Sequence, residues 1–491
     1  MKFIHSNIIY RCISLLVLCL IASCTDNQTS SSPIDKKPNV ILIVVDDWGW
    51  KDAGFLGSQY YETPNLDAFA KEGMVFTHAY AAAANCAPSR ACMLSGRNTP
   101  YHGVYTVSPS DRGNAKTRKL IPIKNTDFLA NEEYTLPQMM KNAGYVTGNF
   151  GKWHIGEDPT LQGIDYNIGG SHRGNPGKNG YFSPYKIDHI TDGPEGEYLT
   201  DRLASEAIQF VEQHQDSTFF LYLPFYTVHT PILGKEELIE KYKDKAPFEG
   251  HRNPVYGAMV SSMDENIGRL LDRLKDLNLY DNSIIILTSD NGGLMNVTDQ
   301  RPLRAGKGAY YEGGIRVPLV MKWKNHIPEN TRNAIRVSNL DFYPTLQEIV
   351  KPKKRAINLE GSDLSPLFAE QSLTERSLYF HFPIYLQSSN TITGLRDPLF
   401  RTRPGSVIID ENWKLHHYFE DDELELYDLN NDPSESNNLA EVNPVKRDEL
   451  YQKLDNWRKE KEAAMPDEIN PLYDAIFTQN KSKEKLEKAN R

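Results

Sequence analysis

The stretch that decides the fold reads NVILIVVDD and covers residues 39–47. Residues 40–45 are an unbroken run of β-branched and leucine side chains, which is typical of a strand buried on both faces of a parallel sheet. Asp46 and Asp47 follow that run directly. In open α/β sheets, ligands gather beyond the carboxyl ends of the strands. The stretch therefore predicts both a central strand and the edge of the sheet at which a site would lie.

A second segment has the same pattern of an apolar strand followed by polar side chains. Residues 283–289 read SIIILTS and are followed by Asp290 and Asn291, and apolar residues recur at helical spacing over 255–274. Residues 219–223 and 317–321 are two further short strand candidates. Strands that alternate with amphipathic helices predict an α/β fold, in which helices sandwich a large, mixed and mostly parallel sheet.

The pattern of predicted elements changes after about residue 375. Residues 407–419 and 424–429 flank an acidic turn and predict a hairpin, and a helix with Leu450, Leu454 and Trp457 on one face should follow. We expect these segments to form a small antiparallel subdomain. The predicted division is a large domain over 38–375, the subdomain over 376–475, and a charged tail over 476–491. We expect the end of this tail, from Lys481 to Arg491, to fray.

The N-terminus reads MKFIHSNIIYRCISLLVLCLIASC. Lys2 and Arg11 accompany a short apolar core, which is the pattern of a secretory signal rather than of a membrane span. The run closes on Cys24 in a sequence that resembles a bacterial lipobox; an ordinary signal peptide is the alternative. We expect a signal peptide over 1–23, a lipid on Cys24 and a polar tether over 24–37. The protein would then be an exported bacterial lipoprotein, anchored to a membrane in the periplasm or at the cell surface.

Composition excludes several classes of protein. The chain has 491 residues, of which 39% are hydrophobic and 24% charged, and these values describe a globular protein rather than a disordered chain or a coiled coil. Its formal net charge of -10 argues against nucleic acid as the main partner. It leaves an anionic substrate open, because local cations can outweigh the net charge.

Cysteines are few. Three of the five belong to the leader, so only Cys86 and Cys92 remain in the folded body. An exported protein of this size with two remaining cysteines has no disulfide framework. The count leaves a bridge between Cys86 and Cys92 open, although we favour a special role for one of them.

The two acidic clusters are candidate metal ligands. Asp46, Asp47, Asp290 and Asn291 offer three carboxylates and one amide oxygen. Hard oxygen ligands suit Ca²⁺ or Mg²⁺ rather than a thiophilic metal. An aspartate after a strand is also often a helix cap or a turn former, and this alternative stays open for either cluster alone. Two clusters after two buried strands favour a metal site.

A further motif, NCAPSRACMLSGR, covers residues 85–97. Pro88 fits the first turn of a helix and Gly96 fits its end. Cys86 would then lie at a helix N-terminus, where the dipole favours an anion, and Arg90 would follow one turn later. From spacing alone, a small buried cysteine beside a structural arginine is the better interpretation.

Six short motifs in order resemble those of the type I sulfatases, the formylglycine-dependent enzymes of the alkaline phosphatase-like superfamily. They cover most of the chain beyond the leader, and WKL (413–415) and ELYDL (425–429) also resemble the C-terminal hairpin of that family. Small departures are Ser95, where threonine is usual, and Trp48 after the aspartate pair. The motifs are NVILIVVDD (39–47), CAPSR with LSGR (86–97), GKWHIG (151–156), VHTP (228–231), SDNGG (289–293), and GKG with EGGIRVP (306–318).

The resemblance implies an alkaline phosphatase-like fold, makes 38–375 the catalytic domain, and assigns roles. Cys86 would be oxidised by a formylglycine-generating maturation enzyme. As the hydrate it would act as the nucleophile toward a sulfate ester beside a divalent cation, for which Ca²⁺ is preferred and Mg²⁺ is the alternative. Arg90, Lys152 and Lys307 would neutralise charge. His229 would be the general acid toward the leaving oxygen, and His154 would take a proton from the second hydroxyl. The implied metal ligands are Asp46, Asp47, Cys86, Asp290 and Asn291.

Substrate specificity has weaker signals. A glycine-rich stretch over 161–184 contains His172 and Arg173, and residues 379–383 contain His381. Both segments resemble places where carbohydrate-active sulfatases contact sugar, so we predict these three residues as substrate-binding. A lipoprotein that faces outward meets polysaccharides, which favours sulfated polysaccharides or oligosaccharides as substrate. The alternatives are a phosphonate monoester or phosphodiester hydrolase of the same superfamily and a catalytically dead, lipid-anchored glycan-binding protein.

Overall fold

Strand β1 (Asn39–Val45) is buried along its whole length, as the apolar run predicts. The computed structural model describes residues 37–177, 179–389 and 391–489. The predicted signal peptide, the lipid site Cys24 and all but the last residue of the tether lie outside the described residues. No helix in the described ranges combines the length and the apolar content needed to cross a membrane.

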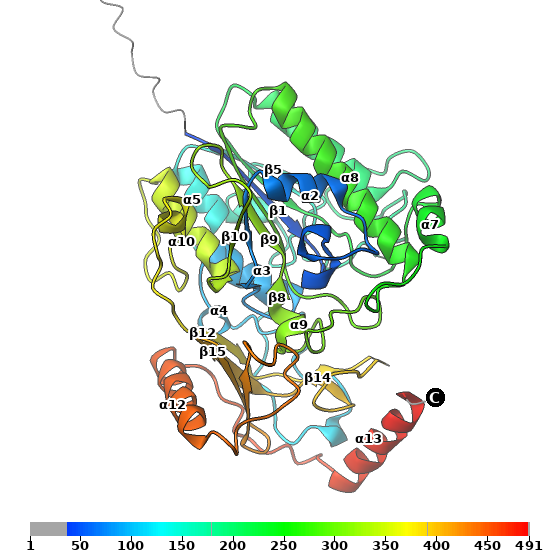
Figure 1. Cartoon of the computed structure of the whole chain (residues 1–491), viewed down its shortest axis with the longest axis vertical. Helices are drawn as coiled ribbons and strands as arrows, with labels where there is room; N and C mark the ends of the chain where they lie inside the picture. Colours follow the sequence, from blue (N-terminus) through cyan, green and yellow to red (C-terminus); the bar gives the residue numbers. More distant parts are fainter. Residues whose placement is uncertain (1–36, 178, 390, 490–491) are drawn as a thin grey trace, which may run out of the picture. The chain divides into compact units, whose positions relative to one another are not determined.

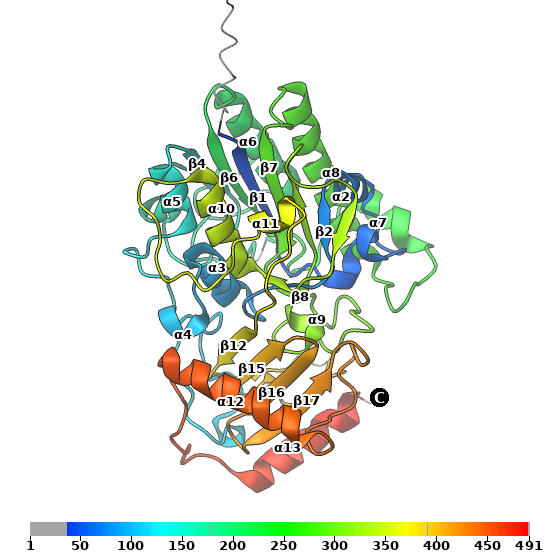
Figure 2. The same ribbon diagram turned by 60° about the vertical axis from the view of Figure 1, so that its left-hand side comes forward.

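The large sheet is mixed and mostly parallel, which confirms the predicted fold class. Its strands run in the order β10-β2-β9-β7-β1-β6-β4-β5 (Figures 1 and 2). β1 pairs in parallel with both β6 and β7, while β9 runs antiparallel to β7 and β2. The other strands of this sheet are β2 (Met74–Phe76), β4 (Val146–Phe150), β5 (Tyr166–Ile168), β6 (Phe219–Pro224), β7 (Ser283–Ser289), β9 (Leu319–Lys322) and β10 (Thr331–Asn333).

Alternate side chains of β1 enter two separate apolar cores. Ile41, Ile43 and Val45 pack with α2, α6 and α8, whereas Val40, Leu42 and Val44 pack with α3, α5, α10 and α11. Figure 1 shows α2 and α8 on one side of the sheet and α5 and α10 on the other. A strand covered on both faces needs an apolar side chain at every position. The helices are α2 (Pro64–Lys71), α3 (Cys86–Ser95), α5 (Leu136–Asn142), α6 (Leu199–Gln213), α8 (Pro254–Asp276), α10 (Phe342–Val350) and α11 (Ser365–Phe368).

Shorter elements connect these layers. A three-stranded sheet has the order β11-β3-β8, and β13 pairs with β14 in a two-stranded sheet. The strands are β3 (Ala79–Tyr80), β8 (Arg316–Val317), β11 (Val337–Ser338), β13 (Leu386–Gln387) and β14 (Phe400–Thr402), and the short helices are α4 (Thr99–His102), α7 (Glu236–Lys243) and α9 (Glu312–Ile315).

A four-stranded antiparallel sheet follows, in the order β12-β15-β16-β17, with β12 (Leu378–Phe382), β15 (Gly405–Asp410), β16 (Trp413–Tyr418) and β17 (Glu423–Asp428). The hairpin across the acidic turn is present as β16 and β17. The segment 407–419, which we predicted as one strand, is itself a hairpin, because the chain turns at Glu411, whose φ is 50°.

One face of this sheet is covered by α12 (Pro444–Glu460), which buries Leu450, Leu454 and Trp457 as predicted (Figure 2). The opposite face packs Phe380, Phe382 and Val407 against residues such as Tyr80 and Tyr310 of the larger domain. The two predicted parts therefore share a hydrophobic core, and the described residues from Pro38 onward pack as one unit.

The expectation of a frayed tail is wrong for the described residues, because α13 spans Ala475–Ala489. Lys481 and Lys488 each lie 2.8 Å from Glu484, one helical turn away, and such pairs support a helix. The helix is also attached to its surroundings, since Lys485 donates a hydrogen bond of 2.6 Å to Ser388 Oγ and Thr478 donates one of 3.0 Å to the carbonyl of Lys116.

A buried ion cluster joins the antiparallel sheet to α9. Lys414 of β16 lies 3.1 Å from Glu312 and 2.9 Å from Glu435, and all three side chains are buried. Glu312 also lies 3.6 Å from Arg316, so it has a second cation, whereas Glu435 shares Lys414 with it. Burial raises the pKa of Glu435 to about 7, and the neighbouring Glu312 adds to this effect while Lys414 opposes it.

This shift predicts a pH dependence of stability. The ordinary pKa of Glu435 is 4.5, so between that value and the raised one the folded state holds a proton that the unfolded state has lost. The stabilisation is fully present at low pH and disappears as the pH rises through about 7, a change on the order of 3 kcal/mol. Glu435→Gln cannot ionise and should lack this component.

Denaturation of the native chain and of Glu435→Gln at about pH 5 and about pH 8 measures the effect. The variant should gain stability relative to the native chain at the higher pH. Glu441→Gln, a change at a side chain that is 96% exposed, should follow the native curve. Parallel curves for Glu435→Gln and the native chain would contradict the assignment.

Candidate active site

The carboxyl ends of four neighbouring strands, β7, β1, β6 and β4, carry most of the predicted site residues. The remaining ones come from α3 and from the loop before α9. Asp290 and Asn291 follow β7, Asp46 and Asp47 follow β1, His229 lies beyond β6, Lys152 and His154 follow β4, Cys86 and Arg90 lie on α3, and Lys307 precedes α9. Segments far apart in the sequence thus meet at one edge of the sheet, as parallel strands require.

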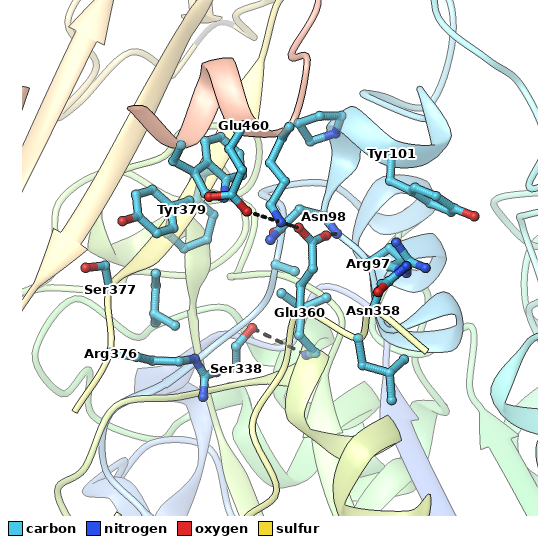
Figure 3. A pocket seen from close by; sticks show the side chains of 18 of the residues that line it. Arg97, Asn98, Tyr101, Ser338, Asn358, Glu360, Arg376, Ser377, Tyr379 and Glu460 are labelled. Atoms are coloured by element: carbon cyan, nitrogen blue, oxygen red, sulfur yellow. Dashed lines mark hydrogen bonds and ion pairs between the residues drawn. The ribbon is translucent and has the colours of Figure 1, made fainter. Parts of the chain in front are cut away.

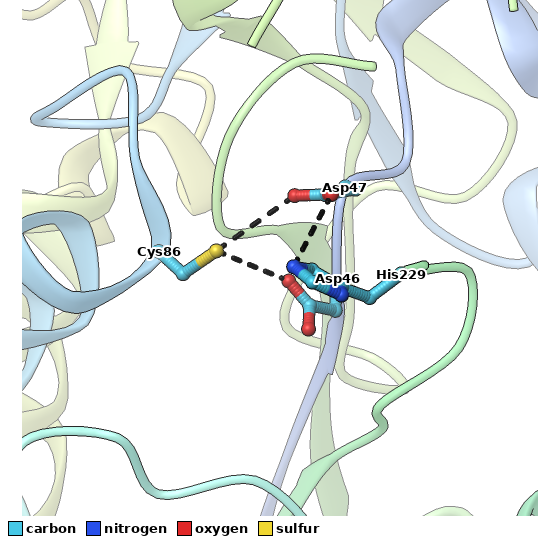
Figure 4. Close-up of side chains that lie close together, drawn as sticks. All are labelled: Asp46, Asp47, Cys86 and His229. Carbon is cyan, nitrogen blue, oxygen red and sulfur yellow. Dashed lines mark hydrogen bonds and ion pairs between the residues drawn. The ribbon is translucent and has the colours of Figure 1, made fainter. Parts of the chain in front are cut away.

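Cys86 begins α3, as the motif predicts, and it is only 1% exposed. Its Sγ lies 3.4 Å from Asp46 Oδ1 and 3.8 Å from Asp47 Oδ1, and Figure 4 shows these side chains converging with His229. Lys307 Nζ lies 3.1 Å from the same sulfur. Cys86 and Cys92 are both free, so no bridge joins them.

Three buried ion pairs surround Cys86. Arg90 Nε lies 2.8 Å from Asp290 Oδ2, and Lys152 Nζ lies 2.6 Å from Asp46 Oδ2. Lys307 Nζ lies 2.6 Å from Asp47 Oδ1. Removing one partner of a buried pair leaves an uncompensated charge and costs about 3–5 kcal/mol. The cations therefore hold the carboxylates in place as well as balancing their charge.

The three carboxylates titrate differently. Burial raises the pKa of Asp46 well above its usual range, and the neighbouring Cys86 adds to this. Burial also acts on Asp47, but Lys307 and His229 outweigh it and lower its pKa. For Asp290, the effect of burial is outweighed by Arg90 and Lys152, so its pKa is lowered as well. A bound divalent cation would favour the ionised form of all three carboxylates, most of all that of Asp46.

The site fits a divalent cation. One ligand atom from each of Asp46, Asp47, Cys86 and His229 lies within 4.8 Å of the others. Asn291 Oδ1 is buried and has no hydrogen-bond partner among the described residues, while its Nδ2 donates to Asp47 Oδ1 over 2.8 Å. Asp290 Oδ1 accepts from the amide of Asp47 over 3.2 Å. The predicted ligands lie together, and the structure adds His229 as a candidate.

Backbone strain occurs at two of these residues. Asp47 has a φ of 62° and His154 has a φ of 68°. Non-glycine residues in this left-handed region cost about 1–2 kcal/mol each, so packing around the site must hold them. A Cβ atom on Gly174 would lie 2.4 Å from His154 Nε2, which shows how closely the glycine-rich loop covers that ring.

The two histidines have different surroundings. Burial lowers the pKa of His154 well below its usual range, and Lys152 and Arg90 add to this, so the ring is neutral. Its Nδ1 is buried without a partner in the part of the chain that the structure describes. His229 Nδ1 lies 2.7 Å from the carbonyl of Thr230, which leaves Nε2, 3.8 Å from Asp47 Oδ2, for the site. Burial and then Lys307 lower the pKa of His229.

A pocket of about 520 Å³ opens above Cys86. Its deep part includes Asp47, His154, His229 and Lys307, and its rim includes the predicted residues His172 and Arg173. The rim also includes Arg112 and Arg401, which sequence reasoning missed. Neither arginine lies in a recognised motif, and each comes from a loop or a two-stranded sheet with no periodic pattern, so the sequence carried no signal for them.

The prediction that His381 contacts substrate is wrong. This side chain is 1% exposed, and both ring nitrogens lie within hydrogen-bond distance of protein groups. Nδ1 is 2.8 Å from Ser406 Oγ, which belongs to the neighbouring strand, and Nε2 is 2.9 Å from the carbonyl of Ala464. Burial also lowers the pKa of His381 to about 4. It is a neutral, hydrogen-bonded residue of the antiparallel sheet.

A larger hollow, of about 790 Å³, lies elsewhere, between α12, β12 and the loop after α3 (Figure 3). Several of its charged groups are partnered, since Lys461 lies 3.0 Å from both Glu360 and Glu460. None of the predicted site residues lines this hollow. Size therefore does not identify the reactive pocket, whereas the convergence of charged groups does.

Comparison with known families decides the identity. Residues 38–351 match the sulfatase family model, and residues 306–464 match the model described as N-sulphoglucosamine sulphohydrolase, C-terminal. The chain belongs to the sulfatase family. Among curated sulfatases, one from Formosa agariphila is 32% identical over 90% of this chain and 91% of its own length. Human N-acetylgalactosamine-6-sulfatase is 32% identical over 72% of this chain and 69% of its own.

Solved structures give the same fold. Ps i-CgsB, in complex with k-i-k-neocarrahexaose, has a TM-score of 0.71 and 28% identity, over 91% of this sulfatase and 97% of that chain. The phosphonate monoester hydrolase of Agrobacterium radiobacter has a TM-score of 0.65 and 21% identity, over 86% and 96% of the two chains, which shows the shared fold alone.

The unpartnered oxygen of Asn291 generates a prediction about metal binding. Asn291→Ala should weaken the affinity for a divalent cation at least about tenfold, because one ligand oxygen is lost while the neighbouring carboxylates remain. Elemental analysis of protein dialysed against graded Ca²⁺ or Mg²⁺ measures the occupancy. Asn266→Ala, a change at a buried asparagine of α8, is the control and should keep native occupancy. Unchanged metal content in Asn291→Ala would remove Asn291 from the ligand set.

Proposed function

We propose that this sulfatase hydrolyses sulfate esters of polysaccharides or oligosaccharides, with formylglycine made from Cys86 and a divalent cation, Ca²⁺ rather than Mg²⁺. The observation that carries the proposal is the position of Cys86, the first residue of α3, where three cations and three carboxylates meet. Formylglycine, once formed by a maturation enzyme, supplies a hydroxyl nucleophile in place of a thiol. The cation, when bound by Asp46, Asp47, Asp290 and Asn291, supplies Lewis-acid polarisation.

The site must first neutralise negative charge, because a sulfate ester is an anion and the site is rich in carboxylates. Lys307 is placed to bind the sulfate group, since its Nζ lies within 3.1 Å of Cys86 Sγ. Lys152 neutralises Asp46. Arg90 keeps one terminal nitrogen buried without a partner among the described residues, while its Nε holds Asp290. These fixed cations stabilise negative charge where it develops, without reorganisation.

Two histidines are placed for the proton steps. His229 presents Nε2 to the site because Nδ1 faces the Thr230 carbonyl, so the ring, once protonated, would give its Nε2 proton to the leaving oxygen. Neutral His154 keeps an unpartnered Nδ1 and is able to accept a proton during release of sulfate. Both rings line the pocket above Cys86.

The carbohydrate class rests on relatives and on the pocket. The human relative is named for N-acetylgalactosamine-6-sulfate, and Ps i-CgsB is bound to a neocarrahexaose. A pocket of about 520 Å³ has the size of sites that hold small ligands. His172 and Arg173 on its rim are the residues that we assign to contact sugar. The leader sequence and Cys24 support export and a lipid anchor in the periplasm or at the cell surface.

The first test is the mass of the tryptic peptide that contains Cys86, from protein made with a formylglycine-generating enzyme. Conversion of the thiol to the aldehyde should lower the mass by about 18 Da. The converted protein should release sulfate from para-nitrophenyl sulfate and from sulfated oligosaccharides faster than it cleaves an aryl phosphate diester. Cys86→Ala should abolish turnover, whereas Cys92→Ala should retain it. A persistent thiol, or full activity in Cys86→Ala, would overturn the nucleophile assignment.

His229→Ala tests the general acid. The rate on alkyl sulfates, whose leaving groups need a proton, should fall about 10²- to 10⁴-fold, and the rate on para-nitrophenyl sulfate should fall much less. His326→Ala is the control, because that ring stacks on Trp323 away from the site. Equal losses on both classes of substrate would count against proton donation by His229.

A further inference from the structure

Two arginines on the rim of the active-site pocket have no carboxylate partner. Arg112 and Arg401 both line the pocket above Cys86. No ion pair of either side chain with a carboxylate is present within the described residues. Arg112 donates to the carbonyls of Val107 and Ser108 over 3.2 Å and 2.5 Å. The Nε of Arg401 is buried and has no partner anywhere in the described chain.

The neighbouring arginines of the same segment behave differently. Arg403 is paired with both Asp397 and Glu420, and Arg396 is paired with Asp421 and Glu423. Those two side chains are neutralised parts of the scaffold. Arg401 lies between them in the sequence, lines the pocket and has no carboxylate ion pair among the described residues, which is unusual for a buried cation that serves only the fold.

The fold places the two arginines on one rim. The amide of Tyr385 donates to the carbonyl of Ser110 over 2.8 Å, and Leu386 of β13 pairs with Thr402 of β14. These pairings fix the segments that carry Arg112 and Arg401 side by side. Burial lowers the pKa of Arg401, Asp47 acts in the opposite direction, and the like charge of Arg112 lowers it further, so the two guanidinium groups repel each other.

Arg401 also contacts the loop that carries Lys307. A Cβ atom at Gly308 would lie 2.8 Å from Arg401 Cδ, so the stem of Arg401 packs against the residue that follows Lys307. The deep position beside Cys86 is held by Lys307 itself, 3.1 Å from the sulfur. Lys307 thus occupies the position beside Cys86, and Arg401, packed against the next residue of the same loop, adds a separate cation to the pocket wall.

We propose that Arg112 and Arg401 form a second anion site, which binds another sulfate or a carboxylate of the substrate beside the sulfate that is cleaved. The inference rests on the proposed function and narrows it. The substrate class becomes a glycan with two neighbouring anionic groups, either on one sugar or on adjacent sugars. The planar fork of a guanidinium suits either oxyanion, and binding it relieves the repulsion between the two arginines.

The test combines changes in the substrate with changes in the enzyme. The panel contains para-nitrophenyl sulfate and sulfated disaccharides in three forms: with one sulfate, with a second sulfate, and with one sulfate and a uronate carboxylate. The formylglycine-bearing native protein should have its highest kcat/KM on a member with two anionic groups. Removing the second group should lower kcat/KM about 10- to 100-fold, mainly through KM. The two dianionic forms show which oxyanion the site prefers.

Arg401→Gln should erase most of this preference, so that the ratio of kcat/KM between dianionic and monoanionic substrates falls toward one. Arg112→Gln should act in the same direction. Arg401→Lys keeps the charge without the fork and should retain part of the ratio, which covers the case that the glutamine variant is unstable. Arg355→Gln is the matched control, because Arg355 is exposed and pairs only with Glu348 among its described neighbours; it should keep the native ratio.

Two results would overturn the second anion site. One is a native protein that has no preference for substrates with two anionic groups, or that prefers those with one. The other is an equal loss on both classes of substrate in Arg401→Gln, since the arginine would then bind the reacting sulfate. If the converted protein hydrolyses no sulfate ester, para-nitrophenyl sulfate included, the proposed function itself fails. Hydrolysis without preference overturns only the second anion site.

Discussion

The structure depends on the burial of three carboxylates and three cations at one edge of a sheet. Asp46, Asp47 and Asp290 are each held by a different cation, from α3, from the segment after β4 and from the loop before α9. None of these charges is stable at such depth alone. The strands and the loops that carry them must therefore arrive together, and the reactive position of Cys86 is defined by this arrangement rather than by α3 itself.

The parts that sequence analysis could predict are those whose cause is local. β1 and β7 can be predicted because a strand covered on both faces must be apolar at each position. α3 can be predicted because Pro88 and Gly96 mark its ends. The site residues were found because they lie next to these elements or in short motifs with a fixed order. Spacing alone did not distinguish Cys86 from an ordinary buried cysteine. The motif order raised that possibility, and the distances to Asp46 and Lys307 now give it a physical basis.

The parts that could not be predicted depend on contacts between distant segments. His381 occupies a plausible position in the sequence, but its direction is set by pairing with Ser406 on the neighbouring strand, which buries it. Arg401 is distinguished from Arg403 only by which carboxylates lie nearby. The helix α13 was expected to fray because its composition is charged, and its contacts with Lys116 and Ser388 are invisible in the sequence. In each case the deciding neighbour is too far away in the chain to leave a pattern.

Two C-terminal sheets contact the same loop. Lys414 of β16, in the four-stranded sheet, holds Glu312, five residues after Lys307, while Arg401 of β14, in the two-stranded sheet, packs against Gly308. The backbone of the loop is further fixed where Lys307 donates to the carbonyl of Gly293 and Gly308 to that of Ala84, both over 2.8 Å. The four-stranded sheet thus helps to position a cation at the reacting centre, and the two-stranded sheet supplies one to the pocket wall. Changes at Arg401 can alter which glycan is bound while the buried charges around Cys86 stay as they are.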